Sequence, residues 1–292
     1  MDSLAVTHPD APDPPRIGLL QHLTYTLLSA GLLLLLFTLL RLALLVHNRA
    51  QVGATPVSQL VEAFANGARF DLRVAAFVCL PLLLAMLSPQ LMQARRWMHR
   101  WLSVLAGITL FLGVVELDFY REFNQRLNGL VFQYMKEDPK TVLSMLWFGF
   151  PVLRYLLAWA VATGLAVWLF RRLDALTRSR VAEPSAQRPP RFDRWFVRLP
   201  VLLVCLLAAV LAIRGTLRQG PPLRWGDAFT TESMFANQLG LNGTLSLVAA
   251  ALGQISEQRD KLWKASLPAA EATAIVRRML LTADDTLVDA DL

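Results

Sequence analysis

The sequence is poor in the residues that build most catalytic and metal sites. It has two cysteines and four histidines among 292 residues. Cys79 and Cys205 both lie inside apolar runs, which favours small buried side chains over a disulfide or a metal pair. The histidines show no spacing typical of metal ligands, and there is no HExxH, paired CxxC, glycine-rich phosphate loop or GxSxG. We therefore expect no catalytic residue, metal ligand or cofactor site within this chain.

Charged residues are scarce too, at 17% of the chain, whereas roughly a quarter is usual in soluble proteins. Hydrophobic residues make up 55%, and the mean hydropathy is +0.43. A soluble chain of this length needs more polar surface than that to cover its core. The net charge of +7 comes mostly from arginines that flank apolar runs, which indicates membrane topology rather than nucleic-acid binding. We expect the lipid bilayer as a partner and no nucleic acid.

Five stretches are long and apolar enough to cross a bilayer, which takes about 20 residues. They are Thr24–Val46, Leu72–Leu91, Trp101–Leu117, Pro151–Phe170 and Phe196–Ile213. The predicted fold class is all-α: a polytopic membrane protein with about five transmembrane helices plus interfacial and juxtamembrane linker helices. The chain then divides into an N-terminal tail (1–23), a five-helix membrane domain (24–213) and linker helices (214–292).

The connections between the predicted spans differ in charge. Arginines cluster between the second and third spans and again between the fourth and fifth, whereas the other two connections balance acidic and basic residues. Positively charged connections stay in the cytoplasm. This pattern predicts a bacterial cytoplasmic (inner) membrane protein with its N-terminus inside and everything after Ile213 outside.

The outer segments also have helical character. Val57–Phe70 and Tyr120–Leu146 carry apolar residues at helical spacing, which is typical of helices lying on the membrane surface; ordinary amphipathic connectors are the alternative. Arg214–Gly240 is expected to be a loop. Further helices are expected near Leu245–Glu257 and Ala269–Leu281.

Charged side chains inside or beside a span are costly and often functional. With the predicted orientation, nearly all of them gather at the outer ends of the helices. One interpretation is that they extend toward water and form internal ion pairs, such as Arg41 with Glu116. The other is that guanidinium groups hold an anionic phospholipid headgroup. The lipid-headgroup candidates are Arg41, Arg69, Asp71, Arg73, Glu116, Asp118, Tyr120, Arg121, Arg154 and Arg214.

Three sequence motifs resemble those of a known family. Gly-Ala-Arg-Phe-Asp-Leu at 67–72 resembles the G-x-R-F-D-L signature of the lipoteichoic acid synthase and phosphoglycerol transferase family. So do Glu-Leu-Asp-Phe-Tyr-Arg-Glu-Phe-Asn-Gln-Arg-Leu-Asn at 116–128 and Phe-Ala-Asn-Gln-Leu-Gly-Leu-Asn-Gly at 235–243. Their order relative to the predicted spans also fits, and the resemblance covers roughly residues 20–265.

The resemblance implies an enzyme in two parts. Members of this family have a five-helix membrane domain, linker helices and a large outer domain of the alkaline phosphatase/sulfatase type. The outer domain uses a metal ion, commonly manganese, and a threonine nucleophile to transfer glycerol phosphate from phosphatidylglycerol. This chain ends where that domain would begin, so the nucleophile and metal ligands have no matching positions here.

The sequence therefore predicts the membrane anchor of a phosphoglycerol-transferase-like enzyme, which also presents an anionic lipid. On this interpretation the chain is inactive alone. The alternative is a non-enzymatic membrane interaction or scaffold protein that shares the helix pattern.

Overall fold

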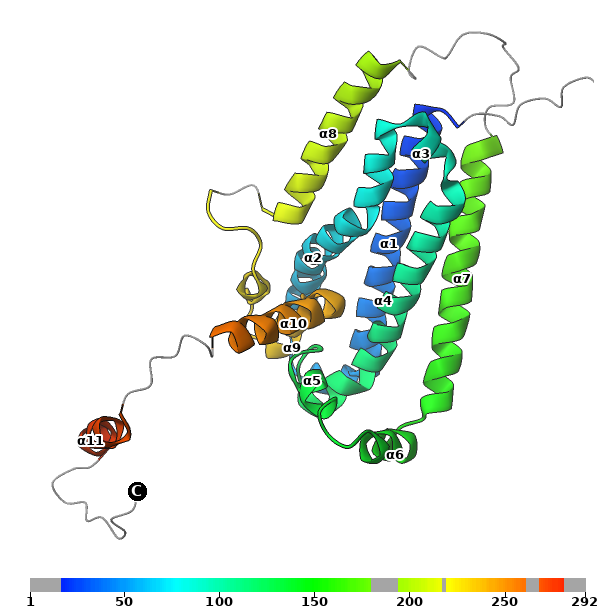
Figure 1. Cartoon of the computed structure of the whole chain (residues 1–292). Helices are drawn as coiled ribbons and strands as arrows, with labels where there is room; N and C mark the ends of the chain where they lie inside the picture. The colour runs from blue at the N-terminus through cyan, green and yellow to red at the C-terminus, as the bar shows by residue number, and fades with distance from the viewer. Residues whose placement is uncertain (1–16, 180–193, 217–218, 261–267, 281–292) are drawn as a thin grey trace, which may run out of the picture. The chain divides into compact units, whose positions relative to one another are not determined.

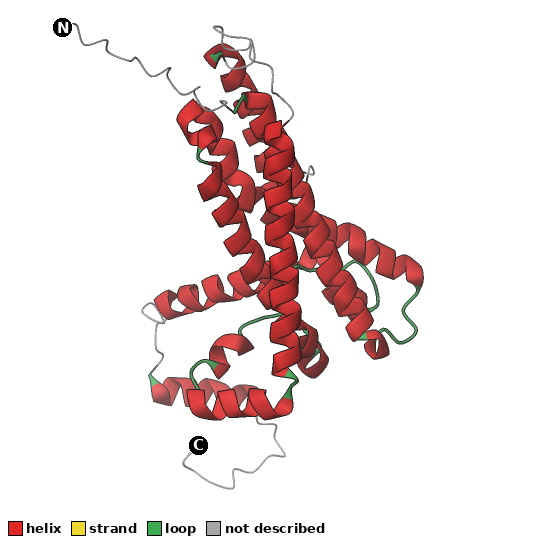
Figure 2. Cartoon of the chain, turned by 90° about the vertical axis from the view of Figure 1, so that its right-hand side faces the viewer, coloured by secondary structure: helices red, strands yellow, loops and turns green. Residues whose placement is uncertain are grey.

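The computed structural model describes residues 17–179, 194–216, 219–260 and 268–280. Every regular element within these ranges is a helix (Figures 1 and 2). The chain forms two compact units, residues 1–249 and 250–292. The first unit holds the five longest helices and the start of α10 (Gly243–Asp260). The second holds α10 from residue 250 onward and α11 (Ala269–Leu280).

Among the described residues, five helices are long and apolar enough to cross a membrane. They are α1 (Leu19–His47), α2 (Val57–Leu84), α4 (Arg95–Phe123), α7 (Val152–Ser179) and α8 (Trp195–Arg214). At 1.5 Å per residue, even α8 with its 20 residues spans about 30 Å, the thickness of a hydrocarbon core. The prediction of an all-α polytopic membrane protein is confirmed.

The second span corrects two predicted boundaries. The sequence predicts a surface helix over Val57–Phe70 followed by a span over Leu72–Leu91, but α2 runs unbroken from Val57 to Leu84. Backbone hydrogen bonds continue wherever no residue interrupts them, so a fall in hydropathy marks the edge of the apolar surface rather than the end of the helix. After α2 come a 3₁₀ turn, η2 (Ala85–Leu87), and the short α3 (Pro89–Gln93).

The third span is longer than predicted for the same reason. The sequence predicts Trp101–Leu117, whereas α4 extends from Arg95 to Phe123. Its last residue is followed by Asn124 in the left-handed region, with φ 52°, a conformation that commonly ends helices. The polar residues near both ends of α4 therefore belong to the same continuous helix as its apolar centre.

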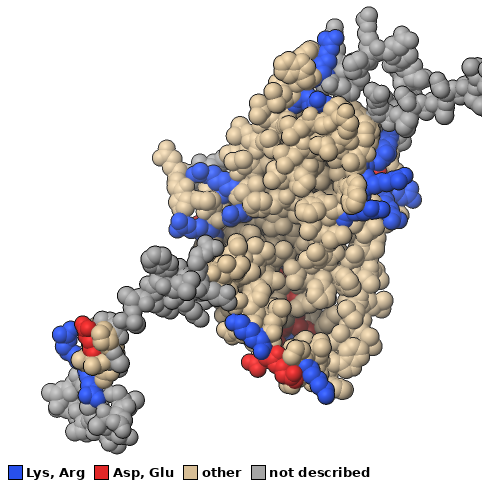
Figure 3. All heavy atoms as spheres, viewed as in Figure 1, with Lys and Arg blue, Asp and Glu red and all other residues tan. Residues whose placement is uncertain are grey.

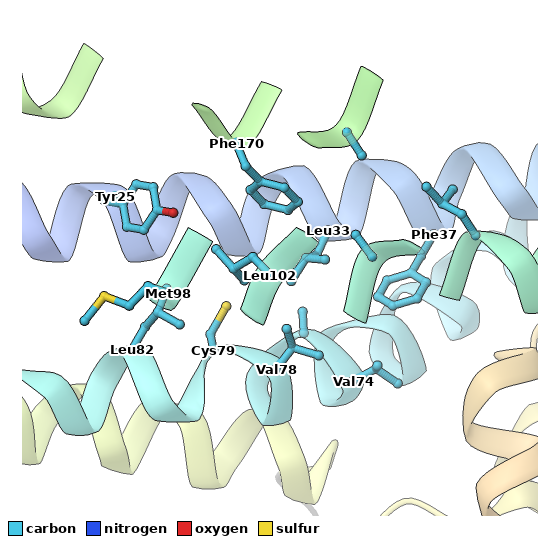
Figure 4. Packing of buried hydrophobic residues seen from close by; sticks show 14 of the residues in the cluster. Tyr25, Leu33, Phe37, Val74, Val78, Cys79, Leu82, Met98, Leu102 and Phe170 are labelled. Carbon is cyan, nitrogen blue, oxygen red and sulfur yellow. The ribbon is translucent and has the colours of Figure 1, made fainter. Parts of the chain in front are cut away.

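Helix α1 packs against α2, α4 and α7, and α8 packs against α2. The buried residues of α1 form one stripe at helical spacing, which includes Tyr25, Ser29, Leu33, Phe37 and Arg41. Side chains of the four packed helices meet in this core, where Phe170 points from α7 toward α1 (Figure 4). Many leucines on the other faces are exposed, as expected where helices contact lipid.

The end of the bundle where α1 and α4 finish carries several short helices, and we call it the α9 end. They are η1 (Arg49–Gln51), α5 (Leu130–Tyr134), α6 (Pro139–Gly149), η4 (Trp225–Ala228) and α9 (Met234–Leu239). The predicted helix over Tyr120–Leu146 is thus divided among α4, α5 and α6. The predicted loop over Arg214–Gly240 contains η4 and α9, whose start is capped by the Ser233 hydroxyl. The opposite end, which carries α3, is the α3 end.

Helices α10 and α11 appear where the sequence predicts them, near Leu245–Glu257 and Ala269–Leu281. The charged side chains gather toward the helix ends, and a broad surface over the long helices carries none in the view of Figure 3. Cys79 and Cys205 are free thiols inside α2 and α8. Cys79 is buried, as the sequence predicts, whereas Cys205 is only half-buried.

Candidate functional site

Four ionised side chains come together at the α9 end in what we call the paired-charge cluster. Arg41 comes from α1, Asp71 from α2, Glu116 from α4 and Arg126 from the segment after α4. Their side chains are each at most 7% exposed. Two positive and two negative charges face one another there, so the cluster is close to neutral as a whole.

Arg41 and Asp71 form a two-point ion pair. Arg41 donates from Nη1 to Asp71 Oδ2 at 2.6 Å and from Nη2 to Oδ1 at 3.0 Å, the parallel geometry that makes guanidinium–carboxylate pairs strong and directional. Asn242 adds a third donor, from Nδ2 to Asp71 Oδ1 at 2.8 Å. The Asp71 carboxylate is therefore fully held by protein groups.

Arg126 and Glu116 form the second pair. Arg126 Nη1 donates to Glu116 Oε2 at 2.6 Å, and the backbone N–H of Leu127 donates to Oε1 at 3.3 Å. Burial lowers the pKa of the Arg126 guanidinium, and the Glu116 carboxylate opposes that shift. Removing either partner would leave the other charge buried and uncompensated, which is strongly destabilising.

Both arginines also hold the end of α9. Arg41 Nε donates to the Leu239 carbonyl at 2.9 Å and Arg126 Nε to the Gln238 carbonyl at 2.9 Å. Arg126 Nη2 also donates to the Leu241 carbonyl. The last carbonyls of a helix have no partner within it and attract cations. The cluster thus fastens α9, which follows the last long helix in the chain, to α1, α2 and α4.

Two glycines make this close packing possible. A Cβ at Gly67 of α2 would lie 2.2 Å from Arg41 Cζ, and one at Gly243 would lie 2.1 Å from Glu116 Oε1. Both distances are shorter than any real contact, so any larger residue would push a charged partner out of place. Gly67 opens the motif at 67–72 and Gly243 ends the motif at 235–243, so close packing against a charged side chain explains why each motif has a glycine at that position.

A cavity of about 20 Å³ lies beside the cluster. Its lining includes Phe37, Thr109 and Thr244 together with the four charged residues. That volume holds about one water molecule. The cluster as it stands therefore binds its own chain and leaves no room for a phospholipid headgroup.

Asp118 is the centre of a second, smaller group. It accepts from His47 Nε2 at 2.9 Å and from Arg121 Nη1 at 3.1 Å, and the Tyr155 hydroxyl also donates to it. This group links α1, α4 and α7. Tyr120 is not part of this group; its ring centroid lies 5.6 Å from that of Phe235 in α9.

Three other candidates bind backbone carbonyls in the segment after α8. Arg69 donates to Gly215 at 3.1 Å, Arg73 Nη1 to Leu223 at 2.7 Å and Arg214 Nη2 to Gly220 at 2.9 Å. Arg69 and Arg73 thus tie the segment between α8 and η4 to α2, while Arg214 ties that segment to the end of α8. Arg154 is exposed on the first turn of α7.

The structure brings Arg41, Asp71 and Glu116 into one cluster, and the other seven candidates lie outside it. The predicted ion pair of Arg41 with Glu116 is wrong: Asp71 takes Arg41 because Gly67, one turn earlier on α2, lets the guanidinium approach. Arg126 takes Glu116 instead. Arg126 and Asn242 were not among the predicted site residues, although both lie inside the motifs at 116–128 and 235–243.

No known protein family, curated protein or solved structure matches this chain. Within the ranges that the structure describes, no three His, Cys, Asp or Glu side chains gather as a metal site would need. The assignment of the site therefore depends on its own geometry.

Proposed function

We propose that this chain anchors a phosphoglycerol-transferase-like catalytic domain in the cytoplasmic membrane and fixes its orientation. The observation that carries the proposal is the hold of Arg41 and Arg126 on the carbonyls of Gln238, Leu239 and Leu241. A simple tether needs no such contacts, because five apolar helices already secure the chain in a bilayer. A domain that works on lipid at the membrane surface does need a fixed approach to that surface.

The energetics of the cluster agree with an orienting role. Burying ion pairs adds little net stability compared with an apolar core, but it makes alternative packings costly because each would leave a charge unpaired. Here the two pairs specify one arrangement of α9 on three long helices. The two pairs therefore fix where α9 ends on the bundle.

The proposed orientation places the α9 end outside the cell. Arg95, Arg96 and Arg100 begin α4, and Arg171, Arg172 and Arg178 end α7, so all six lie at the α3 end. The bias toward cytoplasmic arginine puts that end inside. The N-terminal tail is then cytoplasmic and the linker helices are extracytoplasmic.

Presentation of an anionic lipid is a second role, which one observation favours. Arg121 is half-exposed and Arg154 is exposed at the α9 end, where guanidinium groups can reach a lipid phosphate. Arg41 is different, because its guanidinium already donates to Asp71, Leu239 and Leu241. Within the predicted set, Arg121 and Arg154 are therefore the residues we propose for headgroup contact.

The orientation is tested by cysteine labelling. In a chain with Cys79 and Cys205 changed to alanine, single cysteines replace the exposed Thr230 and Arg172. A membrane-impermeant maleimide applied to intact spheroplasts should label Thr230→Cys but not Arg172→Cys, which should react only after lysis. The opposite labelling pattern would contradict the proposed orientation.

The enzymatic part is tested by reading the coding DNA beyond Leu292 in all three frames. A following domain with metal-binding hydrolase features would support the anchor of an enzyme. Unrelated sequence would contradict it and favour a non-enzymatic membrane interaction or scaffold protein.

A further inference from the structure

The α3 end contains a cavity that the paired-charge cluster does not explain. It has a volume of about 150 Å³ and lies between η2 and the first turns of α8. The described residues that line it are Met86, Leu87, Trp195, Arg198, Leu199 and Leu202. We call it the α8 pocket. It is smaller than the roughly 300–1,000 Å³ of sites for drug-sized ligands, but it can take a segment of hydrocarbon chain.

Arg198 gives this apolar pocket a single charge. Its Nη1 atom is buried and has no hydrogen-bond partner among the described residues. No described carboxylate forms an ion pair with it either. A buried guanidinium donor without an acceptor is costly, so the site calls for an acceptor from outside the described chain.

The other lining residues indicate what carries that acceptor. Leu199 is 44% exposed and Leu87 57% exposed, so the pocket has an apolar rim open to the surroundings of the helices. Trp195 is 69% exposed at the start of α8, and tryptophan is enriched at the boundary between hydrocarbon and headgroups. An apolar wall, a boundary tryptophan and one guanidinium nitrogen without an acceptor together complement an acyl chain that ends in a phosphate.

We propose that the α8 pocket binds an anionic phospholipid, with its phosphate on Arg198 and the upper part of one acyl chain against Leu87, Leu199 and Leu202. Basic pockets between membrane helices bind acidic headgroups in this way. The bound lipid would fill the gap between α8 and η2 and strengthen the attachment of α8, which packs mainly on α2. This site lies at the opposite end from the paired-charge cluster and does not depend on the proposed function.

The test is native mass spectrometry of the full chain released from micelles, titrated with short-chain phosphatidylglycerol. Phosphatidylcholine with the same chains and inorganic phosphate serve as comparison probes. We expect one saturable phosphatidylglycerol adduct, weaker phosphatidylcholine binding and no retained phosphate. Arg198→Gln should weaken the phosphatidylglycerol adduct about tenfold, the size expected for losing one charged hydrogen bond.

The matched control is Arg100→Gln. Arg100 is an exposed arginine at the same end, with its guanidinium 5.2 Å from the Trp97 ring centroid, and it does not line the pocket. Its removal should leave the adduct unchanged. Leu199→Trp, which keeps Arg198 but fills the pocket, should also weaken the adduct; it tests the acyl-chain contact if Arg198→Gln fails to fold.

Three results would overturn the proposal. One is equal lipid binding by the wild type and both pocket variants. The second is equal loss in Arg198→Gln and Arg100→Gln, which would indicate attraction to surface charge in general. The third is retention of inorganic phosphate as strongly as phosphatidylglycerol, which would show that the acyl chain does not contribute to binding.

Discussion

Both ends of the helix bundle bury arginine side chains, but the ion pairs and hydrogen bonds that those arginines form differ between the two ends. At the α9 end, Arg41 and Arg126 each lie 2.6 Å from a carboxylate oxygen and also donate to backbone carbonyls. At the α3 end, Arg95 is wholly buried, yet its nearest carboxylate, Asp174, is 3.5 Å away and 21% exposed. Arg178 shares that carboxylate at 2.9 Å.

Arg95 relies on weaker contacts instead. Its guanidinium stacks 4.1 Å from the Tyr25 ring centroid and donates to the Gln21 carbonyl at 3.2 Å, while its Nε has no hydrogen-bond partner among the described residues. The ion pairs at the α9 end are therefore shorter and more buried than the pair at the α3 end, so we expect the α9 end to tolerate less change. The proposed anchoring role predicts this contrast.

The largest effect should come from removing one carboxylate at each end. Glu116→Gln leaves Arg126 buried without its counter-charge, so we expect a loss of about 3–5 kcal/mol in the free energy of unfolding. Asp174→Asn should cost less, about 1–3 kcal/mol: Arg95 is wholly buried, but the pair is long, Asp174 is partly exposed and the asparagine oxygen can still accept a hydrogen bond. Unfolding in mixed micelles with increasing sodium dodecyl sulfate measures both, and equal losses would contradict the contrast.

A smaller effect should come from filling the space beside Arg41. Gly67→Ala places a methyl group on the guanidinium, and we expect a loss of about 1–3 kcal/mol from overpacking. Gly31→Ala in α1 is the matched control, since nothing lies within 4 Å of its added Cβ; it should be neutral or stabilising by up to about 1 kcal/mol. The same unfolding measurement applies. A Gly67→Ala variant as stable as Gly31→Ala would show that the approach of Arg41 is not tight.

The smallest effect concerns the start of α6. Hydrogen bonds from the hydroxyl and backbone N–H of Thr141 lower the pKa of the exposed Asp138 carboxyl. A lowered pKa in the folded state means that this cap contributes above the ordinary pKa and is lost as the pH falls below about 4. After correction for the intrinsic exchange rate at each pH, protection of the amides at 139–149 from hydrogen exchange should fall there in the wild type. Asp138→Asn, which caps without titrating, should lack this loss of protection; identical profiles would contradict the account.

The sequence predicts the five spans and the helices α10 and α11 because hydropathy and length are local properties. It does not predict where α2 and α4 begin and end, since a helix continues through polar residues as long as they do not interrupt its backbone hydrogen bonds. Helix α9 also escapes prediction: six residues from Met234 to Leu239 carry too little periodicity to be recognised.

The candidate residues could be predicted, but their partners could not. Charge near a span identifies Arg41, Asp71 and Glu116 as unusual, whereas the choice of Asp71 over Glu116 for Arg41 depends on how α1 and α2 pack at Gly67. Arg126 comes after the third span in the sequence, where an arginine looks like an ordinary surface residue. Only the return of α9 to the bundle buries it.

The central claim is that the paired-charge cluster holds α9 on the bundle, and hydrogen exchange of residues 234–242 tests it most directly. In micelles, under conditions where both variants stay folded, Glu116→Gln should accelerate exchange of these amides by at least tenfold while the centre of α1 stays protected. Asp174→Asn should leave them unchanged. Unchanged exchange in Glu116→Gln would contradict the account, because α9 would then be held by something other than the paired charges.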